Sequence, residues 1–326
     1  MILILSVSQD SGANGVTRWL SRWNQKFLRL NKDDITHKIN DLTLTDSGFS
    51  FTARGQEINS DNLKSIWFRK GSFWSKQYSE PLCIEGCSAL SASMNRIIKT
   101  EEQISKKYFH YLLFNGGIKC LGNPLLSDPN KLIVLRLAQQ VGLKVSPFSV
   151  GRKLTIKQSD APSNYITKAI HNGIYLWDFD ETRRGYFSYT EELSEVLKSR
   201  DPNLPHVLSF VQEKVEKLYE VRTFFLDGEF HSVAIISQND PQTAVDCRKY
   251  NEEMPNRNIP YSLPVSIKSK LAELFHLLEL NTGSVDLIRN NKGEYVFLEV
   301  NPSGMYGPIK KHANIDVDRL IAKWLS

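Results

Sequence analysis

Hydrophobic positions in the first 121 residues switch repeatedly between strand-like and helix-like spacing. The chain opens with the apolar run ILILSV, has helical spacing over residues 16–23, and returns to an extended pattern in KFLRL. Short strands are predicted in GFSFTA and IWFRKG. A long helix is predicted over residues 84–114, where Leu90, Met94, Ile97 and Ile98 recur at helical spacing. Alternating strands and helices predict an α/β layer with parallel strands.

The middle of the chain begins with the turn-rich segment GNPLLSDPN. A helix is predicted from Lys131 to about Val141, ended by Gly142, and strands are predicted in VSPFSVG and NYITKAI. Residues 171–188 mix glycine, aromatic and charged residues without a clear period, which predicts a mobile loop with short irregular strands.

The last part of the chain, from Leu208 onward, has the pattern of an α+β domain. LSFVQEKV is predicted to be a strand, and YEVRTFFLDGEFHSVAII a hairpin that turns at Asp227–Gly228. A helix over residues 265–280 precedes a second hairpin, made of GSVDLIR and EYVFLEV. These patterns predict three domains, over residues 1–121, 122–207 and 208–326.

Composition and charge argue against several classes of protein. Of 326 residues, 41 are basic and 36 acidic; this net charge of +5, without a Lys/Arg-rich run, is too small to indicate nucleic-acid binding. No apolar run approaches the ~18 residues of a membrane span, and the N-terminus lacks the basic residues of a signal peptide. The four cysteines, Cys83, Cys87, Cys120 and Cys247, fit reduced thiols in a cytoplasmic protein.

The stretch FLEVNPSG predicts a metal site at the end of the last strand. Glu299 and Asn301 share one face of that strand because side chains alternate. A two-residue turn at Lys292–Gly293 would place Asp286 opposite Glu299, and two facing carboxylates repel unless a cation lies between them. Oxygen ligands of this kind suit Mg²⁺. A bulge at Gly293 would shift the pairing by one residue, and an ordinary polar strand end is the alternative interpretation.

Other charged residues also lie in predicted strands. Glu220 and Arg222 share a face of YEVRTFF, either as functional groups or as a solvated ion pair. Lys168 lies in the apolar strand YITKAI, where an ammonium group needs a partner or a route to solvent. A lysine at a strand edge is the alternative interpretation.

The ordered set of these residues resembles the ATP-grasp ligases. It consists of Lys131, Lys168, QEKV at 212–215, Glu220-x-Arg222, Asp286 and Glu299-x-Asn301. The motifs IWFRKGSF, YEVRTFFLDGEF, DCRKYN and VFLEVNPSG are similar to those of the peptide maturases that make microviridin-type graspetides, above all the maturase of the grasp-with-spasm systems. The chain departs from the pattern at Met305 and Tyr306, where the family often has glutamine and an aromatic residue, and at Lys70, where arginine is commoner.

The resemblance implies an ATP-grasp fold with an N-terminal pre-grasp α/β domain, a central domain and a C-terminal grasp domain, with ATP between the latter two. Each candidate residue then has an implied role. Lys131 and Lys168 would contact phosphates; Gln212, Glu213, Lys214 and Val215 would line the adenine, largely through the backbone of Glu213 and Val215; Glu220 would bind the ribose, Arg222 the γ-phosphate, and Asp286, Glu299 and Asn301 Mg²⁺.

The implied reaction joins Asp or Glu side chains of a ribosomal precursor peptide to Ser, Thr or Lys side chains through an acyl phosphate. Asp246 and Arg248 match the segment that meets the acidic core residue, and Arg69, with Lys70, is expected to meet an acid or phosphate. The resemblance also implies a homodimer. Two alternatives remain: an ATP-grasp ligase for a small amino acid, a dipeptide or a protein C-terminus, and a nucleotide-dependent peptide-binding module without catalysis.

Overall fold

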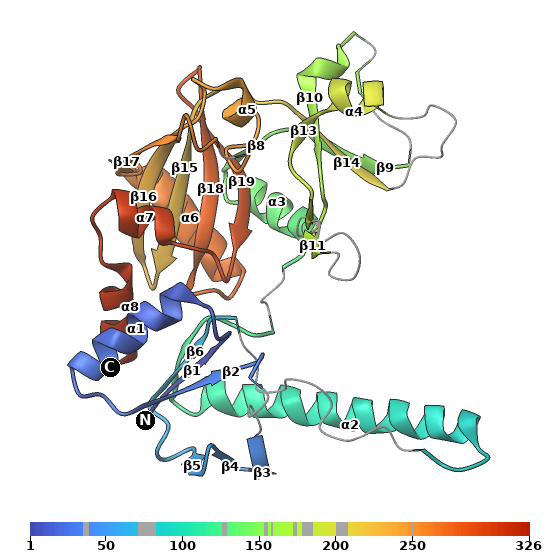
Figure 1. Ribbon diagram of the computed structural model, residues 1–326, viewed down its shortest axis with the longest axis vertical. Helices are drawn as coiled ribbons and strands as arrows, with labels where there is room; N and C mark the ends of the chain where they lie inside the picture. The colour runs from blue at the N-terminus through green and yellow to red at the C-terminus, as the bar shows by residue number, and fades with distance from the viewer. Residues whose placement is uncertain are drawn as a thin grey trace. The chain divides into compact units, whose positions relative to one another are not determined.

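The computed structural model describes residues 1–34, 39–70, 83–125, 129–152, 156–157, 159–171, 175–177, 185–199, 208–249 and 251–326. The chain forms two compact units, one of residues 1–127 with 316–326 and one of residues 128–315 (Figure 1). The first predicted boundary, at 121/122, lies close to this division. The further division at 207/208 stays a prediction.

The first unit is built on a parallel four-stranded sheet in the order β2-β1-β6-β7. Its strands are β1 (Ile2–Ser6), β2 (Phe27–Asn31), β6 (Ser65–Phe68) and β7 (Lys119–Leu121). This arrangement confirms the predicted parallel α/β layer. All residues of β1 are buried, as the apolar run ILILS requires of a central strand.

Two helices from opposite ends of the chain pack side by side in this unit (Figure 1). α1 (Ser11–Arg22) begins earlier than predicted, because the Asp10 side chain caps it by accepting a hydrogen bond from Ala13 N at 2.8 Å. In front of α8 (Val317–Leu325), Asp316 Oδ2 accepts a hydrogen bond from Trp19 Nε1 at 3.0 Å. Gly15 permits the close approach of α8, since a Cβ there would lie 1.9 Å from an oxygen of Asp318.

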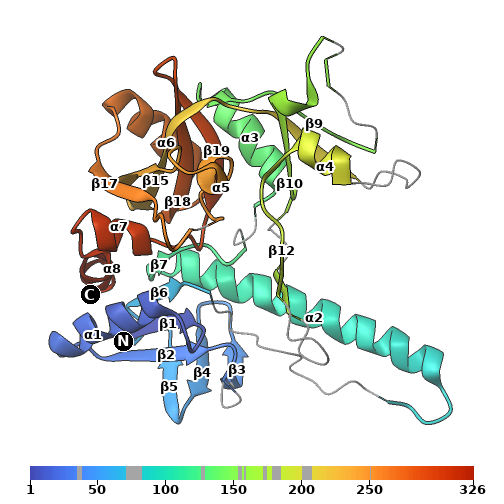
Figure 2. The ribbon, with the colours of Figure 1, turned by 45° about the horizontal axis from the view of Figure 1, so that its top comes forward.

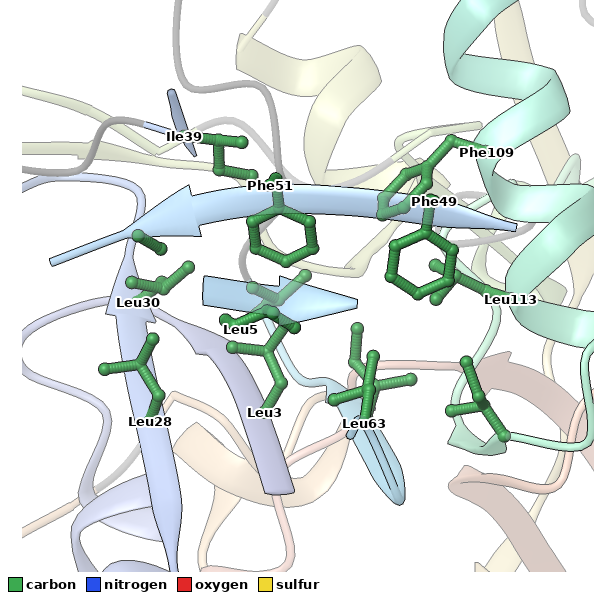
Figure 3. Close-up of a cluster of buried hydrophobic side chains, with 14 of the residues drawn as sticks. Leu3, Leu5, Leu28, Leu30, Ile39, Phe49, Phe51, Leu63, Phe109 and Leu113 are labelled. Carbon is green, nitrogen blue, oxygen red and sulfur yellow. The ribbon is translucent and has the colours of Figure 1, made fainter. Parts of the chain in front are cut away.

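Leucine, isoleucine and phenylalanine side chains form the core of the first unit (Figure 3). They come from the parallel sheet, from the C-terminal part of α2 (Ser88–Asn115), and from an antiparallel sheet of β3 (Ile39–Leu44), β4 (Phe49–Ala53) and β5 (Gln56–Asn59). Phe49 meets Phe109 of α2 edge to face, with ring centroids 4.9 Å apart. The long helix is confirmed, whereas β3 and β5 were not predicted.

The second unit contains a six-stranded sheet in the order β17-β16-β15-β18-β19-β8. The strands are β8 (Lys144–Val145), β15 (Lys217–Leu226), β16 (Glu229–Ile236), β17 (Arg257–Tyr261), β18 (Thr282–Asn290) and β19 (Tyr295–Asn301). α6 (Val265–Leu277) covers one face, where Phe275 stacks on Phe225 of β15 at 4.2 Å. α3 (Lys131–Gln140) packs against β19 and β8, and α7 (Gly307–His312) lies near β16 and β17 (Figure 2).

A second sheet in this unit has the order β13-β10-β14-β9. It contains β9 (Phe148–Gly151), β10 (Tyr165–Lys168), β13 (Glu191–Glu192) and β14 (Ser209–Glu213), and the shorter helices of the unit are η1 (Pro162–Asn164), α4 (Leu193–Ser199) and α5 (Pro241–Ala244). The prediction of one strand in VSPFSVG is wrong. Pro147, which has no N–H to donate, separates β8 in one sheet from β9 in the other.

Most other predicted elements of the second unit are confirmed. The β15–β16 hairpin turns at Asp227 and Gly228, both at positive φ (42° and 97°), as a type I′ turn requires. Within residues 171–188, β11 (Tyr175–Trp177) and β12 (Gly185–Phe187) form an antiparallel pair, and the intervening loop lies outside the described residues. Among the helices that the structure describes, none has both the length and the apolar composition to cross a membrane.

Candidate active site

A row of charged side chains crosses the face of the six-stranded sheet opposite α6. Arg222 of β15 pairs with Asp286 of β18, and Asp286 pairs with Glu299 of β19. Directly paired residues share a face. Arg222 Nη1 lies 3.3 Å from both Asp286 oxygens, and its Nε donates to the Met305 carbonyl at 3.1 Å. The row thus consists of one cation, Arg222, followed by two acids, Asp286 and Glu299, on a half-buried surface.

The facing carboxylates have different proton affinities. Burial, opposed by Arg222 and reinforced by the neighbouring charge of Glu299, raises the pKa of Asp286 to about 6. For Glu299, burial alone would raise the pKa, but Lys131 and Lys168 hold the pKa below the ordinary value. Glu299 is therefore ionised at neutral pH, and Asp286 ionises at a cost that a cation beside it would offset.

Two lysines converge on this row from other elements. Lys131, the first residue of α3, places Nζ 3.0 Å from Glu299 Oε2; the Asn130 side chain caps this helix. Lys168 of β10 lies over the Phe210 ring, with Nζ 5.5 Å from the centroid. Burial, reinforced by the charge of nearby Lys131, lowers the pKa of Lys168 to about 8. The structure thus brings both predicted phosphate-binding lysines to the predicted metal residues.

Asn301 takes up a more exposed position at the end of β19. It pairs with Ser284 of β18, two residues along the same face from Asp286 and Glu299. Its backbone carbonyl accepts a hydrogen bond from Gly304 N at 3.0 Å. Within the described residues no three His, Cys, Asp or Glu side chains are placed to hold a metal ion together; the predicted metal set is two carboxylates and one carboxamide.

Asp246 and Arg248 form a fork after α5. Arg248 Nε donates to Asp246 Oδ1 at 2.9 Å, Nη2 donates to Oδ2 at 2.6 Å, and Thr190 N also donates to Oδ2 at 2.9 Å. Burial alone would raise the pKa of Asp246, but these hydrogen bonds lower it to about 2. The Asp246 side chain is 5% exposed and that of Arg248 48%. The buried acid therefore orients an arginine whose side chain is half exposed.

The segment Gln212–Val215 joins the two sheets and leaves hydrogen-bonding groups open. Gln212 Nε2 donates to the Ser146 carbonyl at 3.1 Å, but its buried Oε1 has no hydrogen-bond partner among the described residues. Glu213 N donates to the Pro147 carbonyl at 2.9 Å. Val215 lies between β14 and β15, and no described residue bonds its backbone N–H or carbonyl. A buried side-chain oxygen such as Gln212 Oε1 is normally satisfied.

Comparison with known proteins gives matches among solved structures. No family model matches the chain, and no curated protein does. A RiPP-associated ATP-grasp ligase from Chryseobacterium gregarium, in complex with ADP and a leader and core peptide, superposes with a TM-score of 0.70 at 19% identity, covering 99% of this chain and 96% of that one. The macrocyclase MdnC from Microcystis aeruginosa, bound with precursor peptide MdnA, has a TM-score of 0.66 at 19% identity over 99% and 98%.

A more distant match is the D-alanyl-alanine synthetase A of Vibrio cholerae, with a TM-score of 0.53 at 12% identity over 99% of this chain and 96% of that one. The chain has the ATP-grasp fold. In this ATP-grasp chain, the predicted residues of the second unit lie on the two sheets, at the start of α3, and on the segments after β14 and after α5.

Arg69 belongs to the first unit of the ATP-grasp chain, at the end of β6. Its Nε lies 3.4 Å from Asp10 Oδ2, and Lys70 Nζ lies 3.0 Å from the same oxygen. Arg69 is buried, with its guanidinium near the Trp67 ring at 5.8 Å. Its predicted contact with an acidic substrate stays a prediction.

Two residues beside Glu220 were missed in the sequence. Lys217 Nζ forms an ion pair with Glu220 Oε1, and Cys247 Sγ lies 3.2 Å from Glu220 Oε2. Glu220 is thus not paired with Arg222, although both lie on one face. Strand alternation places residues 217 and 220 on opposite faces, so the pattern gave no signal for Lys217.

Proposed function

We propose that this chain is an ATP-dependent ligase that crosslinks a ribosomal precursor peptide. It would join Asp or Glu side chains to Ser or Thr as esters, or to Lys as amides. The observation that carries the proposal is that Lys131 and Lys168 converge on the Asp286–Glu299 pair close to the Asp246–Arg248 fork. The charge of Arg248 acts on both Lys168 and Asp286. The ligases of similar fold in complex with precursor peptides support it.

The residues present fit ATP and Mg²⁺. The unpartnered Gln212 Oε1 and the open backbone of Val215 suit the donor and acceptor edge of adenine. Asp286, Glu299 and Asn301 offer the hard oxygen donors that Mg²⁺ prefers, and a cation beside Asp286 would offset the cost of ionising this buried carboxyl group. When bound, Mg²⁺ would neutralise phosphate charge beside these residues.

In the proposed reaction, a substrate carboxylate oxygen attacks the γ-phosphorus and ADP leaves. Lys131, Lys168 and Arg222 would hold the phosphate oxygens and stabilise their charge. The hydroxyl or amine then attacks the acyl carbon, loses its proton, and inorganic phosphate leaves. Arg248 would bind the acidic side chain of the substrate through its guanidinium, and Asp246 fixes the orientation of that guanidinium.

The test of this proposal is ADP release with different co-substrates. We expect release with ATP, Mg²⁺ and an acidic, Ser/Thr/Lys-rich precursor encoded beside the gene, and none with free amino acids. Release with amino acids alone would favour the small-substrate ligase, which the fold shared with the D-alanyl-alanine synthetase makes the second candidate. Tight peptide binding without any ADP would indicate the non-catalytic module.

Changing Gln212 to leucine tests the adenine assignment. The variant removes the buried Oε1 that we expect to accept a hydrogen bond from the adenine amino group. We expect the KM for ATP to rise about tenfold, as for one lost buried hydrogen bond, and the preference for ATP over GTP to narrow. Kinetics with both nucleotides measure this. An unchanged preference would contradict the assignment.

We also propose that the protein is a cytoplasmic homodimer, and exposed residues on α2 support the dimer. Leu90, Ile97, Ile104 and Tyr111 are 51–59% exposed and recur every seven residues, so they form one line. Phe109 and Leu113, which enter the core, lie on the opposite side of the helix. The line therefore faces away from its own domain.

Sedimentation velocity tests this dimer with matched variants of α2. Ile97→Asp with Ile104→Asp is expected to give monomers. Ala92→Asp with Gln103→Asp, exposed positions on the other side of the helix, should remain dimeric. A wild-type monomer, or dimers in both variants, would contradict this surface.

A further inference from the structure

Lys217 is a buried cation without an assigned role. Its side chain is 5% exposed, and its Nζ is held by Glu220 Oε1 and by the Val245 carbonyl, which accepts at 3.2 Å. Burying an ammonium group is unfavourable unless acceptors replace its water, and here a carboxylate and a carbonyl do so. The Glu220 side chain, at 15% exposed, depends in turn on this cation for its own charge balance.

A β-bulge creates this contact. Lys217 pairs with Asn290 and Tyr219 with Arg289, so Leu218 is one extra residue in β15. The extra residue turns Lys217 onto the face of Glu220, and Leu218 itself is 49% exposed. Bulges of this kind commonly re-aim a side chain beside a functional site. The bulge therefore interrupts the regular pairing of β15 with β18 and leaves Leu218 exposed, and in return it brings the Lys217 ammonium group to Glu220.

Glu220 is held on both oxygens and still has acceptor capacity. Lys217 binds Oε1, and the Cys247 thiol donates to Oε2 at 3.2 Å. Burial and the nearby Glu220 raise the pKa of Cys247, so the sulfur keeps its proton and remains a donor. Each carboxylate oxygen can accept a second hydrogen bond. Glu220 is thus an oriented acceptor rather than a free surface acid.

The same contacts reach the segment that carries the fork. Lys217 Nζ donates to the Val245 carbonyl, and the Cys247 thiol donates to Glu220. Val245 and Cys247 are the two residues that flank Asp246. Asp246 itself bonds Arg248 and Thr190. Lys217 therefore touches both the carboxylate assigned to the ribose and the segment assigned to the acidic substrate.

We propose that Lys217 is a positioning residue that fixes Glu220 for the ribose hydroxyls of the nucleotide and ties it to the segment bearing Asp246 and Arg248. The inference rests on the proposed function and adds a residue to it. The buried Lys217 ammonium group would then help both to recognise the ribose and to place the acidic side chain of the substrate.

The experiment compares ATP with 2′,3′-dideoxy-ATP, which lacks both hydroxyls that Glu220 would accept. For the wild type we expect a KM about tenfold lower for ATP. Lys217→Met should raise the KM for ATP to within about twofold of the dideoxy value, leave the dideoxy KM nearly unchanged, and raise the KM for the peptide. Lys217→Arg should restore part of the preference. Lys270→Met, which removes a partly exposed lysine of α6 bonded to the Gly142 carbonyl, is the control and should match wild type.

An Lys217→Met variant that keeps the tenfold preference would overturn the inference. So would an equal loss with both nucleotides, because that is the result of a general structural role. Should Lys217→Met fail to fold, Cys247→Ala removes the other donor to Glu220 and must narrow the preference about threefold. If the wild type releases no ADP with any substrate, the proposed function fails, and calorimetric binding of the two nucleotides still decides the role of Lys217.

Discussion

Asp286→Asn is expected to abolish ADP release while leaving the folded protein at least as stable as wild type. Asparagine keeps the shape of the side chain but removes the charge that faces Glu299 and, in the proposed function, binds Mg²⁺. We expect activity to fall by at least about a thousandfold, as for the loss of a group that stabilises developing charge. Glu294→Gln, on the same hairpin but paired with exposed Lys144, is the matched control.

The stability expectation follows from the pKa of Asp286. The folded value of about 6 lies above the ordinary 3.8, so the folded state binds the proton more tightly than the unfolded state does. Without Mg²⁺, the contribution of Asp286 to stability is fully present below about pH 4 and is lost as pH rises through about 6. A shift of about two pH units corresponds to about 3 kcal/mol, which Asp286→Asn would recover at neutral pH.

Thermal unfolding of both proteins between pH 4 and pH 8, without metal, measures this effect. Mg²⁺ should raise the melting temperature of the wild type and not of the Asp286→Asn variant. A variant that is less stable than wild type at pH 8, or one that still turns over ATP, would contradict the assigned role.

Arg248→Ala is expected to stop crosslinking while nucleotide binding persists. The Arg248 side chain is half exposed, and two hydrogen bonds to Asp246 fix the orientation of its guanidinium, which in the proposed function binds the substrate carboxylate. We expect peptide crosslinking to fall at least about a hundredfold, equivalent to about 3 kcal/mol, and the Kd for ATP to change less than about twofold.

Conservative and neighbouring variants separate the roles of Arg248. Arg248→Lys should not rescue the reaction, because a lysine lacks the planar guanidinium that would bind both the Asp246 carboxylate and the substrate carboxylate. Lys249→Ala, the next residue, whose Nζ lies 3.5 Å from Glu191, should behave as wild type. Crosslinking at the wild-type rate in Arg248→Ala would refute the substrate role.

The predicted Asp286–Glu299 pair forms, but through a different hairpin. Near the turn, Leu287 pairs with Phe297 and Arg289 with Tyr295, so the connection is longer than the predicted two residues. Leu298 is then an extra residue in β19, and this bulge shifts the pairing by one and brings Glu299 opposite Asp286. The longer turn and the bulge at Leu298 each shift the pairing by one residue in opposite directions, so Asp286 and Glu299 still face each other. Alternation and hydrophobicity predict the strands and the facing acids, but neither locates a bulge.

The same limit explains Lys217, which a second bulge turns toward Glu220. Bulges depend on packing across three strands, which a single strand's pattern does not contain. Local signals succeeded where one residue decides the geometry, as at Asp227–Gly228 or at Asn130 before α3. They failed at Pro147, where a continuous apolar run divides between two sheets.

The α2 helix illustrates a different limit. Its apolar spacing predicts a helix correctly, yet apolar spacing alone does not say whether the face meets the chain's own core. Phe109, His110 and Leu113 are buried, whereas Ile97 and Ile104 are exposed. Tyr306, after the last strand, is buried against Phe224 with ring centroids 5.0 Å apart, which its place in the sequence does not reveal.

The measurement that tests the central claim most directly is the intact mass of the precursor peptide after incubation with the protein, ATP and Mg²⁺. The account predicts the loss of one water for each crosslink, absent without ATP and absent with the Asp286→Asn variant. A precursor that keeps its full mass while the protein consumes ATP with small amino acids would contradict it.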